Sequence, residues 1–153
     1  MTKVTDSRTD ILIADDDKDD ANLLAEAIHD ILPSGHCIHV TDGIAALRHI
    51  KTSVEPDLVF LDLNMPLKNG INCLKDIYNL ELLPNTPIVI YSTSKNIKDI
   101  DDAYNYGASF YIVKPASFAG LCKIIKLAIT ILGKPKSERV EKSNFVLREL
   151  KSA

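Results

Sequence analysis

The stretch that decides the fold is "ILIADDDKDD", residues 11–20, in which an apolar run passes directly into five aspartates within six positions. A short apolar run favours a buried strand, and the apolar side chains of residues 21–32 that follow have helical spacing. The acids therefore stand where a strand turns into a helix. Carboxylates this close repel one another, and burying one without a partner is costly. The stretch thus requires a nearby counter-charge.

Four further apolar runs predict four more strands. They are mostly continuous rather than alternating, and they are rich in β-branched or aromatic residues, which is typical of strands buried on both faces of a parallel sheet. The runs are "CIHV" (37–40), "LVFL" (58–61), "IVIY" (88–91) and "FYIV" (110–113). The first of these is the weakest signal and fits an edge strand.

Segments with an apolar residue every three or four positions follow the runs and predict helices, the last of which ends near Leu132. Strand and helix then alternate five times along the chain. Such crossovers are right-handed and place helices on both faces of the sheet. We therefore predict an α/β fold with a doubly wound, parallel five-stranded sheet of the (βα)5 type.

The composition fits one globular domain and excludes several functions. The chain has 153 residues, of which 46% are hydrophobic, and a formal net charge of −3. This balance argues against a nucleic-acid-binding surface. The first ten residues are polar, unlike a secretory signal, and no apolar stretch reaches about 18 residues. We expect a cytoplasmic protein with neither nucleic acid nor a membrane as its partner.

Three parts of the chain differ in character. We expect residues 1–9 to be disordered, residues 10–132 to form the domain, and residues 133–153 to form a charged tail. The tail carries six Lys or Arg and three Glu, and it is too short for a second domain. We expect it to be solvated, with a short amphipathic helix from about Ser143 as the alternative.

Some of the acids in the opening stretch have a structural explanation. Acidic residues at a helix start commonly cap the helix or interact favourably with its dipole. We assign Asp17 to the cap, and Asp19 and Asp20 to the first turn. Only Asp15 and Asp16 then remain at the end of the strand.

Chemistry-bearing side chains follow four of the five predicted strands. Ligands bind beyond the carboxyl ends of the strands in an open α/β sheet, so these side chains are expected to lie together. They are Asp15 and Asp16 after the first strand, Asp62 and Asn64 after the third, Ser92 and Thr93 after the fourth, and Lys114 after the fifth.

Crowded carboxylates at this edge require a cation. Mg²⁺ suits them because it takes oxygen ligands. Lys114 supplies a second positive charge that can bind an anionic oxygen, and a hydroxyl can donate to the same oxygen. This combination favours an oxygen-rich anion, of which a phosphoryl group is the natural candidate. A carboxylate beside Mg²⁺ can itself be the nucleophile, which gives an aspartyl phosphate.

At these residues the sequence resembles the receiver domain of two-component response regulators. The similarity extends from about Asp10 to Leu132 and implies a flavodoxin-like, five-stranded sheet in the order 2-1-3-4-5. The matching motifs are "ILIADDD" (11–17), "LVFLDLNMPLKNG" (58–70), "PIVIYS" (87–92) and "GASFYIVKP" (107–115).

The resemblance implies a phosphoacceptor site. Asp62 is then the residue that accepts the phosphoryl group, and Lys114 contacts a phosphoryl oxygen. Mg²⁺ is bound directly by Asp16, Asp62 and the backbone carbonyl of Asn64, whereas Asp15 acts through a bound water.

The resemblance also implies a conformational switch. Ser92 is the switch hydroxyl, with Thr93 as the alternative if the count from Pro87 slips by one, and Tyr111 is the switch aromatic residue. Phosphorylation then biases a two-state equilibrium on the face made by the fourth helix, the fifth strand and the fifth helix, where a downstream protein binds.

The function implied is phosphorelay signalling. A histidine kinase or a phosphotransfer protein donates the phosphoryl group, and the modified protein acts by contact with its target. We expect a stand-alone receiver without a DNA-binding output domain, with a homodimer as a further option. It is not expected to be an enzyme with an external substrate, although receivers catalyse their own phosphorylation and dephosphorylation.

Three alternative functions remain open. A phosphohydrolase of the haloacid-dehalogenase kind carries a second Asp two residues after its nucleophile, where this chain has Asn64, and its nucleophile follows the first strand. A flavodoxin-like FMN carrier needs a phosphate-binding loop after the first strand, where three aspartates would repel phosphate. A pseudo-receiver would have the same fold and bind partners without being phosphorylated.

Overall fold

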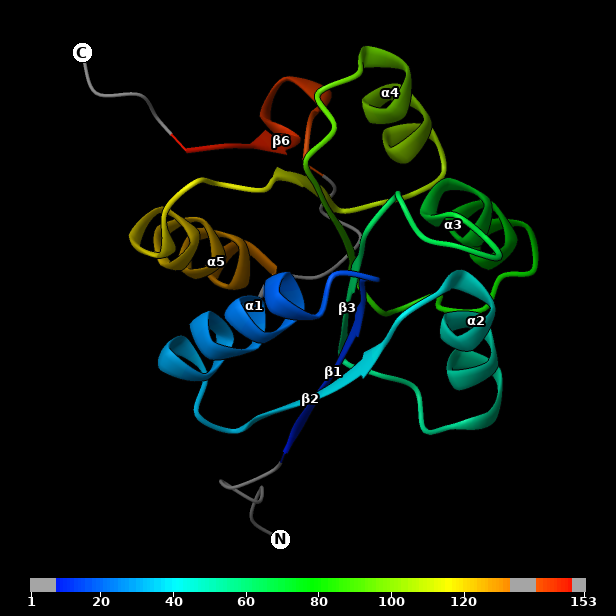
Figure 1. Ribbon diagram of the computed structural model, residues 1–153. Helices are drawn as coiled ribbons and strands as arrows, with labels where there is room; N and C mark the ends of the chain where they lie inside the picture. Colours follow the sequence, from blue (N-terminus) through cyan, green and yellow to red (C-terminus); the bar gives the residue numbers. More distant parts are fainter. Residues whose placement is uncertain (1–7, 133–139, 150–153) are drawn as a thin grey trace, which may run out of the picture.

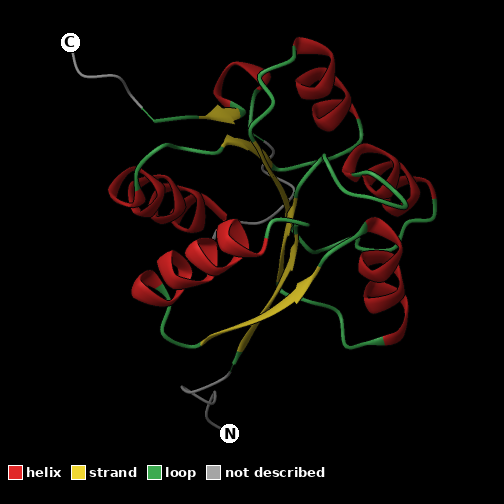
Figure 2. Ribbon diagram, viewed as in Figure 1, coloured by secondary structure: helices red, strands yellow, loops and turns green. Residues whose placement is uncertain are grey.

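Strands and helices alternate along the chain, and the strands form a parallel sheet between two layers of helices (Figure 1). The computed structural model describes residues 8–132 and 140–149. The doubly wound α/β fold is confirmed (Figure 2). Helices α1 (Lys18–Ile31) and α5 (Phe118–Leu132) cover one face of the sheet, and α2 (Gly43–Thr52), α3 (Gly70–Asn79) and α4 (Ile97–Asn105) cover the other.

Among the described residues the sheet has six strands rather than the five predicted. Its order is β2-β1-β3-β4-β5-β6, so the predicted order 2-1-3-4-5 is confirmed and extended by one strand beside β5. The strands are β1 (Thr9–Ala14), β2 (Gly35–Val40), β3 (Leu58–Leu61), β4 (Ile88–Ser92), β5 (Phe110–Val113) and β6 (Val146–Leu147).

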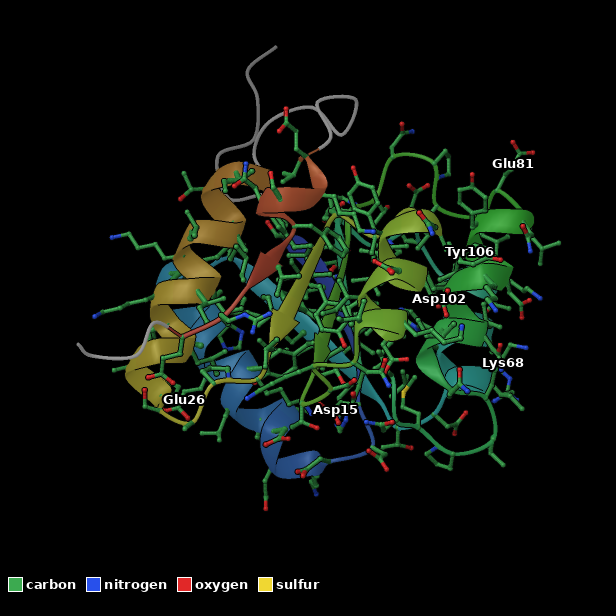
Figure 3. The ribbon with its side chains drawn as sticks, turned by 90° about the horizontal axis from the view of Figure 1, so that it is seen from above. Asp15, Glu26, Lys68, Glu81, Asp102 and Tyr106 are labelled. Atoms are coloured by element: carbon green, nitrogen blue, oxygen red, sulfur yellow. The ribbon has the colours of Figure 1, made fainter. Side chains whose placement is uncertain are left out.

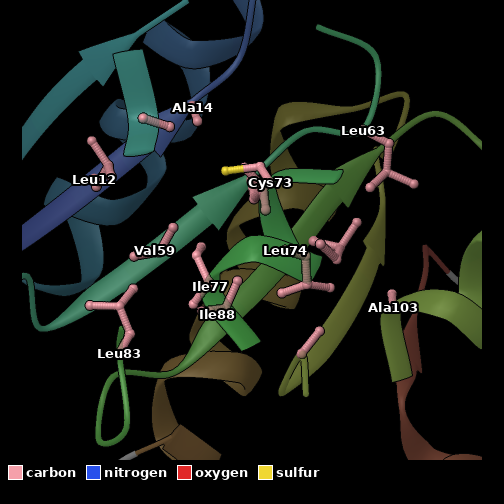
Figure 4. Close-up of a cluster of buried hydrophobic side chains, with 14 of the residues drawn as sticks. Leu12, Ala14, Val59, Leu63, Cys73, Leu74, Ile77, Leu83, Ile88 and Ala103 are labelled. Carbon is pink, nitrogen blue, oxygen red and sulfur yellow. The ribbon is translucent and has the colours of Figure 1, made fainter. Parts of the chain in front are cut away.

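The two faces of the sheet carry separate hydrophobic clusters. Along β1, Leu12 and Ala14 belong to the cluster under α2, α3 and α4, which Figure 4 shows, whereas Ile11 and Ile13 belong to the cluster under α1 and α5. Successive side chains of a strand point to opposite faces, so a strand covered on both sides has to be apolar throughout. This double covering explains the continuous apolar runs of the sequence.

The strand register brings the acidic residues of two motifs side by side. Ala14, the last residue of β1, pairs with Leu61, the last residue of β3. The amide of Asp62 donates to the carbonyl of Ala14 at 2.8 Å, and the amide of Asp15 donates to the carbonyl of Val40 at 3.0 Å. Asp15 and Asp62 therefore leave the sheet at the same level.

Helix α1 begins as predicted. The Asp17 side chain accepts a hydrogen bond from the amide of Asp20, and Asp19 and Asp20 lie in the first turn. An N-cap side chain of this kind satisfies an amide that has no partner within the helix. Helices α2, α3 and α4 start in the same way, with the caps Asp42, Asn69 and Asn96.

The C-terminal segment, defined here as residues 140–149, lies against the sheet, in contrast to the solvated tail or helix that we expected. After a short 3-10 helix, Lys142–Asn144, the chain forms β6, which pairs in parallel with β5 and sets Val146 opposite Tyr111 (Figure 1). The prediction assigned Phe145 and Val146 to the apolar side of the alternative helix, whereas the structure places Val146 in a strand. The segment thus supplies the sixth strand.

Phe145 anchors the C-terminal segment. Its side chain is fully buried, and its ring centroid lies 5.1 Å from that of Tyr104 and 6.3 Å from that of Tyr111. Its carbonyl accepts a hydrogen bond from the amide of Tyr111 at 3.1 Å. Aromatic pairs in such tilted arrangements stabilise a fold by about 0.5–1.5 kcal/mol beyond the burial of their area.

Polar contacts hold both ends of the C-terminal segment. Lys142 forms an ion pair with Asp101 of α4. At the other end, the Glu149 carboxylate accepts hydrogen bonds from the Ser117 hydroxyl at 2.7 Å and from the amide of Ala116 at 3.1 Å, just before α5. The hydrogen bond from Ser117 is the main cause that lowers the pKa of Glu149. The segment thus bridges α4 and α5 across β5.

Two further expectations concern the rest of the chain. Of the predicted disordered segment, residues 1–9, residues 1–7 lie outside the described residues, whereas Thr9 already belongs to β1. Across residues 8–132 and 140–149, none of the helices is both long and apolar enough to span a membrane.

Candidate functional site

The predicted site residues come together at the edge of the sheet where β1, β3, β4 and β5 end. Figure 3 shows Asp15 at this edge, beside the start of α1. Asp62 follows β3, Ser92 ends β4, and Lys114 follows β5. Asp15, Asp62 and Ser92 are buried, and the Lys114 side chain is only 8% exposed. Polar groups from four strand ends thus share one largely buried region.

Lys114 is the centre of this region. Its ammonium nitrogen lies 2.9 Å from Asp15 Oδ2, 3.0 Å from Asp20 Oδ2 and 3.3 Å from Asp62 Oδ2. It also lies 5.1 Å from the centroid of the Tyr91 ring, close enough for a cation–π interaction. Lys114 is therefore the counter-charge that the opening stretch of the sequence requires.

Backbone amides fix the second oxygen of each buried carboxylate. Asp62 Oδ1 accepts hydrogen bonds from the amides of Leu63 at 2.7 Å and Asn64 at 3.4 Å. Asp15 Oδ1 accepts one from the amide of Asp17 at 2.9 Å. Each carboxylate is thus held between a backbone amide and the ammonium of Lys114, which sets its orientation.

A glycine allows the loop that follows Asp62 to close against α3. The amide of Gly70 donates to the carbonyl of Leu63 at 3.0 Å. A Cβ atom at position 70 would lie 2.1 Å from the carbonyl oxygen of Asp62. Only glycine permits this approach, so the start of α3 supports the backbone that carries Asp62.

The carboxylates also form a cluster that can hold a metal ion. Asp15, Asp16 and Asp62 each offer an oxygen, and these oxygens lie within 4.8 Å of one another. Asp16 is exposed, so the cluster opens to solvent on one side. A set of donors made only of oxygens suits a hard divalent cation such as Mg²⁺. Asn64 is also exposed, and it lies next to this cluster because its backbone amide donates to Asp62 Oδ1.

The pKa values of the buried pair follow from burial and charge. Burial raises the pKa of Asp15 to about 6, although hydrogen bonds from Lys114 and from the amide of Asp17 oppose this rise. Burial lowers the pKa of Lys114, but hydrogen bonds with Asp15 and Asp20 and the charge of Asp62 outweigh it and raise the pKa above its ordinary value. Lys114 therefore stays charged, yet it does not return Asp15 to an ordinary pKa.

The two residues predicted to form the switch meet at Ser94. Ser92 is fully buried, and its hydroxyl accepts a hydrogen bond from the amide of Ser94 at 3.2 Å. Tyr111 is also fully buried, and its hydroxyl donates to the carbonyl of Ser94 at 2.9 Å. Thr93, the alternative hydroxyl, is exposed. The hydroxyl that lies within the protein at the end of β4 is thus that of Ser92.

Sequence reasoning missed three contacts of the site. It gave Asp20 only a role at the helix start, although this residue binds Lys114. It did not consider Tyr91, whose ring lies beside the same ammonium. It also overlooked His39, whose Nε2 lies 2.7 Å from the carbonyl of Asp15. The position of His39 near the end of β2 could have indicated that it lies close to the site. The contact of Asp20 with Lys114 depends on tertiary structure, so no pattern in the sequence indicated it.

Comparison with known proteins gives the same assignment. The family model of the response regulator receiver domain matches residues 11–126. The chain is 30% identical to response regulator Rcp1 of Synechocystis sp. over 122 residues, which cover 76% of this chain and 83% of Rcp1. It is 32% identical to chemotaxis protein CheY of Thermotoga maritima over 100 residues, which cover 63% of this chain and 81% of CheY.

Solved structures agree with the sequence comparison. The phosphorylated cyanobacterial phytochrome response regulator RcpA superposes with a TM-score of 0.76 at 30% identity, covering 84% of this chain and 96% of RcpA. The Mn²⁺-bound form of Rcp1 has a TM-score of 0.72 at 28% identity, covering 80% of this chain and 92% of Rcp1. Receiver domains bind Mg²⁺ or Mn²⁺ at an acidic pocket, and this chain has an acidic cluster at that edge of the sheet. The chain belongs to the response regulator receiver domain family, the signalling modules of two-component systems.

Proposed function

We propose that Asp62 accepts a phosphoryl group from a histidine kinase or a phosphotransfer protein, and that the modified chain signals by contact with a downstream protein. One observation carries this proposal: the buried carboxylate of Asp62 has one oxygen on the amide of Leu63 and the other beside Lys114, next to the cluster of Asp15 and Asp16. Family membership supports it.

The proposed reaction is a nucleophilic displacement at phosphorus. An oxygen of Asp62 attacks the phosphorus of a phosphohistidine on the donor, so that an O–P bond forms and the P–N bond breaks, with its electron pair left on the imidazole nitrogen. Lys114 then lies where it can bind a phosphoryl oxygen. The amide of Leu63 holds the carboxylate in place during the attack.

The donor atoms at the edge of the sheet fit the proposed metal ion. Asp16, Asp62 and the backbone carbonyl of Asn64 would hold Mg²⁺, with Asp15 acting through a water molecule. When bound, the ion spreads the negative charge of the transferring group. The exposed side of the cluster at Asp16 provides the route by which the ion and the phosphodonor enter.

The proposed switch acts through Ser92 and Tyr111. A phosphoryl group on Asp62 attracts the hydroxyl of Ser92. In the unmodified chain this hydroxyl accepts a hydrogen bond from the amide of Ser94. Tyr111 hydrogen-bonds the same residue, so a movement of this loop reaches β5 and the face formed by α4, β5 and α5. We propose that a downstream protein reads this face, which includes the C-terminal segment paired with β5.

The direct test is the transfer of a phosphoryl group to the purified chain. Incubation with acetyl phosphate and Mg²⁺ is expected to add the mass of one phosphoryl group to the intact protein, as measured by mass spectrometry. The adduct is expected to be lost in hydroxylamine, which cleaves acyl phosphates but not phosphoserine. An unchanged mass would contradict the proposal and would favour the pseudo-receiver instead.

Mg²⁺ is expected to stabilise the folded chain at neutral pH. The ion relieves repulsion among Asp15, Asp16 and Asp62, and a ligand present at about ten times its Kd stabilises by about 1.4 kcal/mol. For a chain of this size, the melting temperature should rise by about 3–6 °C. Calorimetry with and without millimolar MgCl₂ measures the shift. In the control variant Asp16→Asn, which changes an exposed ligand, the shift should largely disappear; an equal shift in both proteins would contradict the metal site.

A further inference from the structure

Asp20 contacts Lys114, although the sequence alone gave it only a role at the start of α1. It lies in the first turn of α1, and its Oδ2 is 3.0 Å from the ammonium nitrogen of Lys114. Its side chain is 35% exposed, compared with 1% for Asp15. Asp20 is therefore the partner of Lys114 on the solvent side, whereas Asp15 is the partner on the inner side.

The ammonium of Lys114 has a partner for each of its protons. Three carboxylates accept from it, and the Tyr91 ring lies beside it at 5.1 Å. A lysine side chain is a flexible four-carbon stem that loses much rotamer entropy when it is fixed. Without Asp20, one proton would turn to water and the ammonium would be free to move toward solvent.

We propose that Asp20 is a positioning residue, which holds the ammonium of Lys114 against Asp62 so that a phosphoryl group meets it already in place. This inference rests on the proposed phosphorylation of Asp62. The contact to Asp62, at 3.3 Å, is the longest of the three. An arriving phosphoryl oxygen can replace it while the contacts to Asp15 and Asp20 persist, so Lys114 does not have to be reorganised during transfer.

A different role for Asp20 would have a different signature. If Asp20 acted only through its negative charge, it would repel the phosphoryl group and compete for Lys114, so its removal would speed phosphorylation. If it acted only on the helix dipole, Asp19 in the same turn would serve equally well. Positioning instead requires an acceptor atom at residue 20, whether charged or neutral.

The experiment compares three variants of the full chain. Asp20→Ala removes the acceptor, Asp20→Asn keeps an acceptor oxygen without the charge, and Asp19→Ala removes an exposed acid from the same turn. The initial rate of phosphorylation by acetyl phosphate and Mg²⁺ is followed by intact mass. We expect the initial rate of Asp20→Ala to be about three- to tenfold lower than that of the parent, which corresponds to the free energy of one partly exposed, charge-assisted hydrogen bond. The rates of Asp20→Asn and Asp19→Ala should be close to the parent rate.

A second measurement does not depend on phosphorylation. The order parameter of the Lys114 ammonium, from ¹⁵N relaxation in NMR, reports whether the group is held. We expect it to fall in Asp20→Ala and to be retained in Asp20→Asn. An unchanged order parameter in Asp20→Ala, or faster phosphorylation in both Asp20 variants, would overturn the inference. If the parent chain accepts no phosphoryl group, the proposed function fails, and the NMR result still decides whether Asp20 holds Lys114.

Discussion

Asp62→Asn is expected to abolish phosphoryl transfer and to leave the fold intact. The amide has almost the shape of the carboxylate, and its oxygen can still accept from the amide of Leu63, so the loop after β3 should keep its conformation. The amide nitrogen, however, is not a nucleophile. Its N–H groups would face the ammonium of Lys114, so the contact between Lys114 and Asp62 Oδ2 is lost. The loss of activity should be complete rather than partial.

The mass measurement used for the parent chain decides this prediction. Asp62→Asn should show no added mass after treatment with acetyl phosphate and Mg²⁺, whereas the control Asp19→Asn, an exposed acid near the same edge, should be modified like the parent. Circular dichroism spectra and thermal melts should confirm that both variants are folded. Mass gain in Asp62→Asn would show that another residue is the acceptor and would refute the assignment.

Phe145→Ala should lower the free energy of unfolding by about 2–3 kcal/mol. Truncation of a buried Phe commonly costs about 3–5 kcal/mol, part of which arises from the cavity that remains. Here the C-terminal segment can detach, and water can then cover the surfaces of Tyr104 and Tyr111, so the cavity contribution should be smaller. The amide of Tyr111, which donates to the carbonyl of Phe145, should become more accessible.

Urea unfolding followed by circular dichroism measures the loss of stability. The matched control is Phe118→Ala, the same substitution at a side chain that is 37% exposed at the start of α5. It should cost clearly less than Phe145→Ala. Hydrogen exchange of the Tyr111 amide, measured by NMR, should accelerate only in Phe145→Ala. Equal stability losses in the two variants would mean that the C-terminal segment contributes little to the fold.

The sequence revealed most of the fold because burial on two faces leaves a strong pattern. β1, β3, β4 and β5 each contain a short, continuous apolar run, whereas β2 at the edge of the sheet includes two histidines. The residues at the ends of β1, β3, β4 and β5 meet at one edge by the geometry of parallel strands. The helix cap at Asp17 could also be predicted from the sequence, because it depends on residues that are close together in the chain. These features are local, or follow from topology alone.

What the sequence did not reveal depends on contacts between distant residues. β6 has only two residues, and its stability derives from Phe145 packing on Tyr104 and Tyr111. Asp20 already had a sufficient explanation as an acid at a helix start, so nothing local indicated its bond to Lys114, 94 positions away. The roles of Ser92 in switching and of the Asn64 carbonyl in binding metal stay predictions.

The sixth strand has a consequence for how copies of this domain behave in concentrated solution. The family match stops at residue 126, short of residues 140–149. A chain cut after α5, which ends at Leu132, would leave the outer backbone groups of β5 unpaired and would remove Phe145 from the rings of Tyr104 and Tyr111. An open, apolar sheet edge is a template on which another chain can add its own strand, and proteins commonly cover such edges. Because the short strand at 146–147 covers the edge of β5, we expect it to disfavour edge-to-edge association of copies.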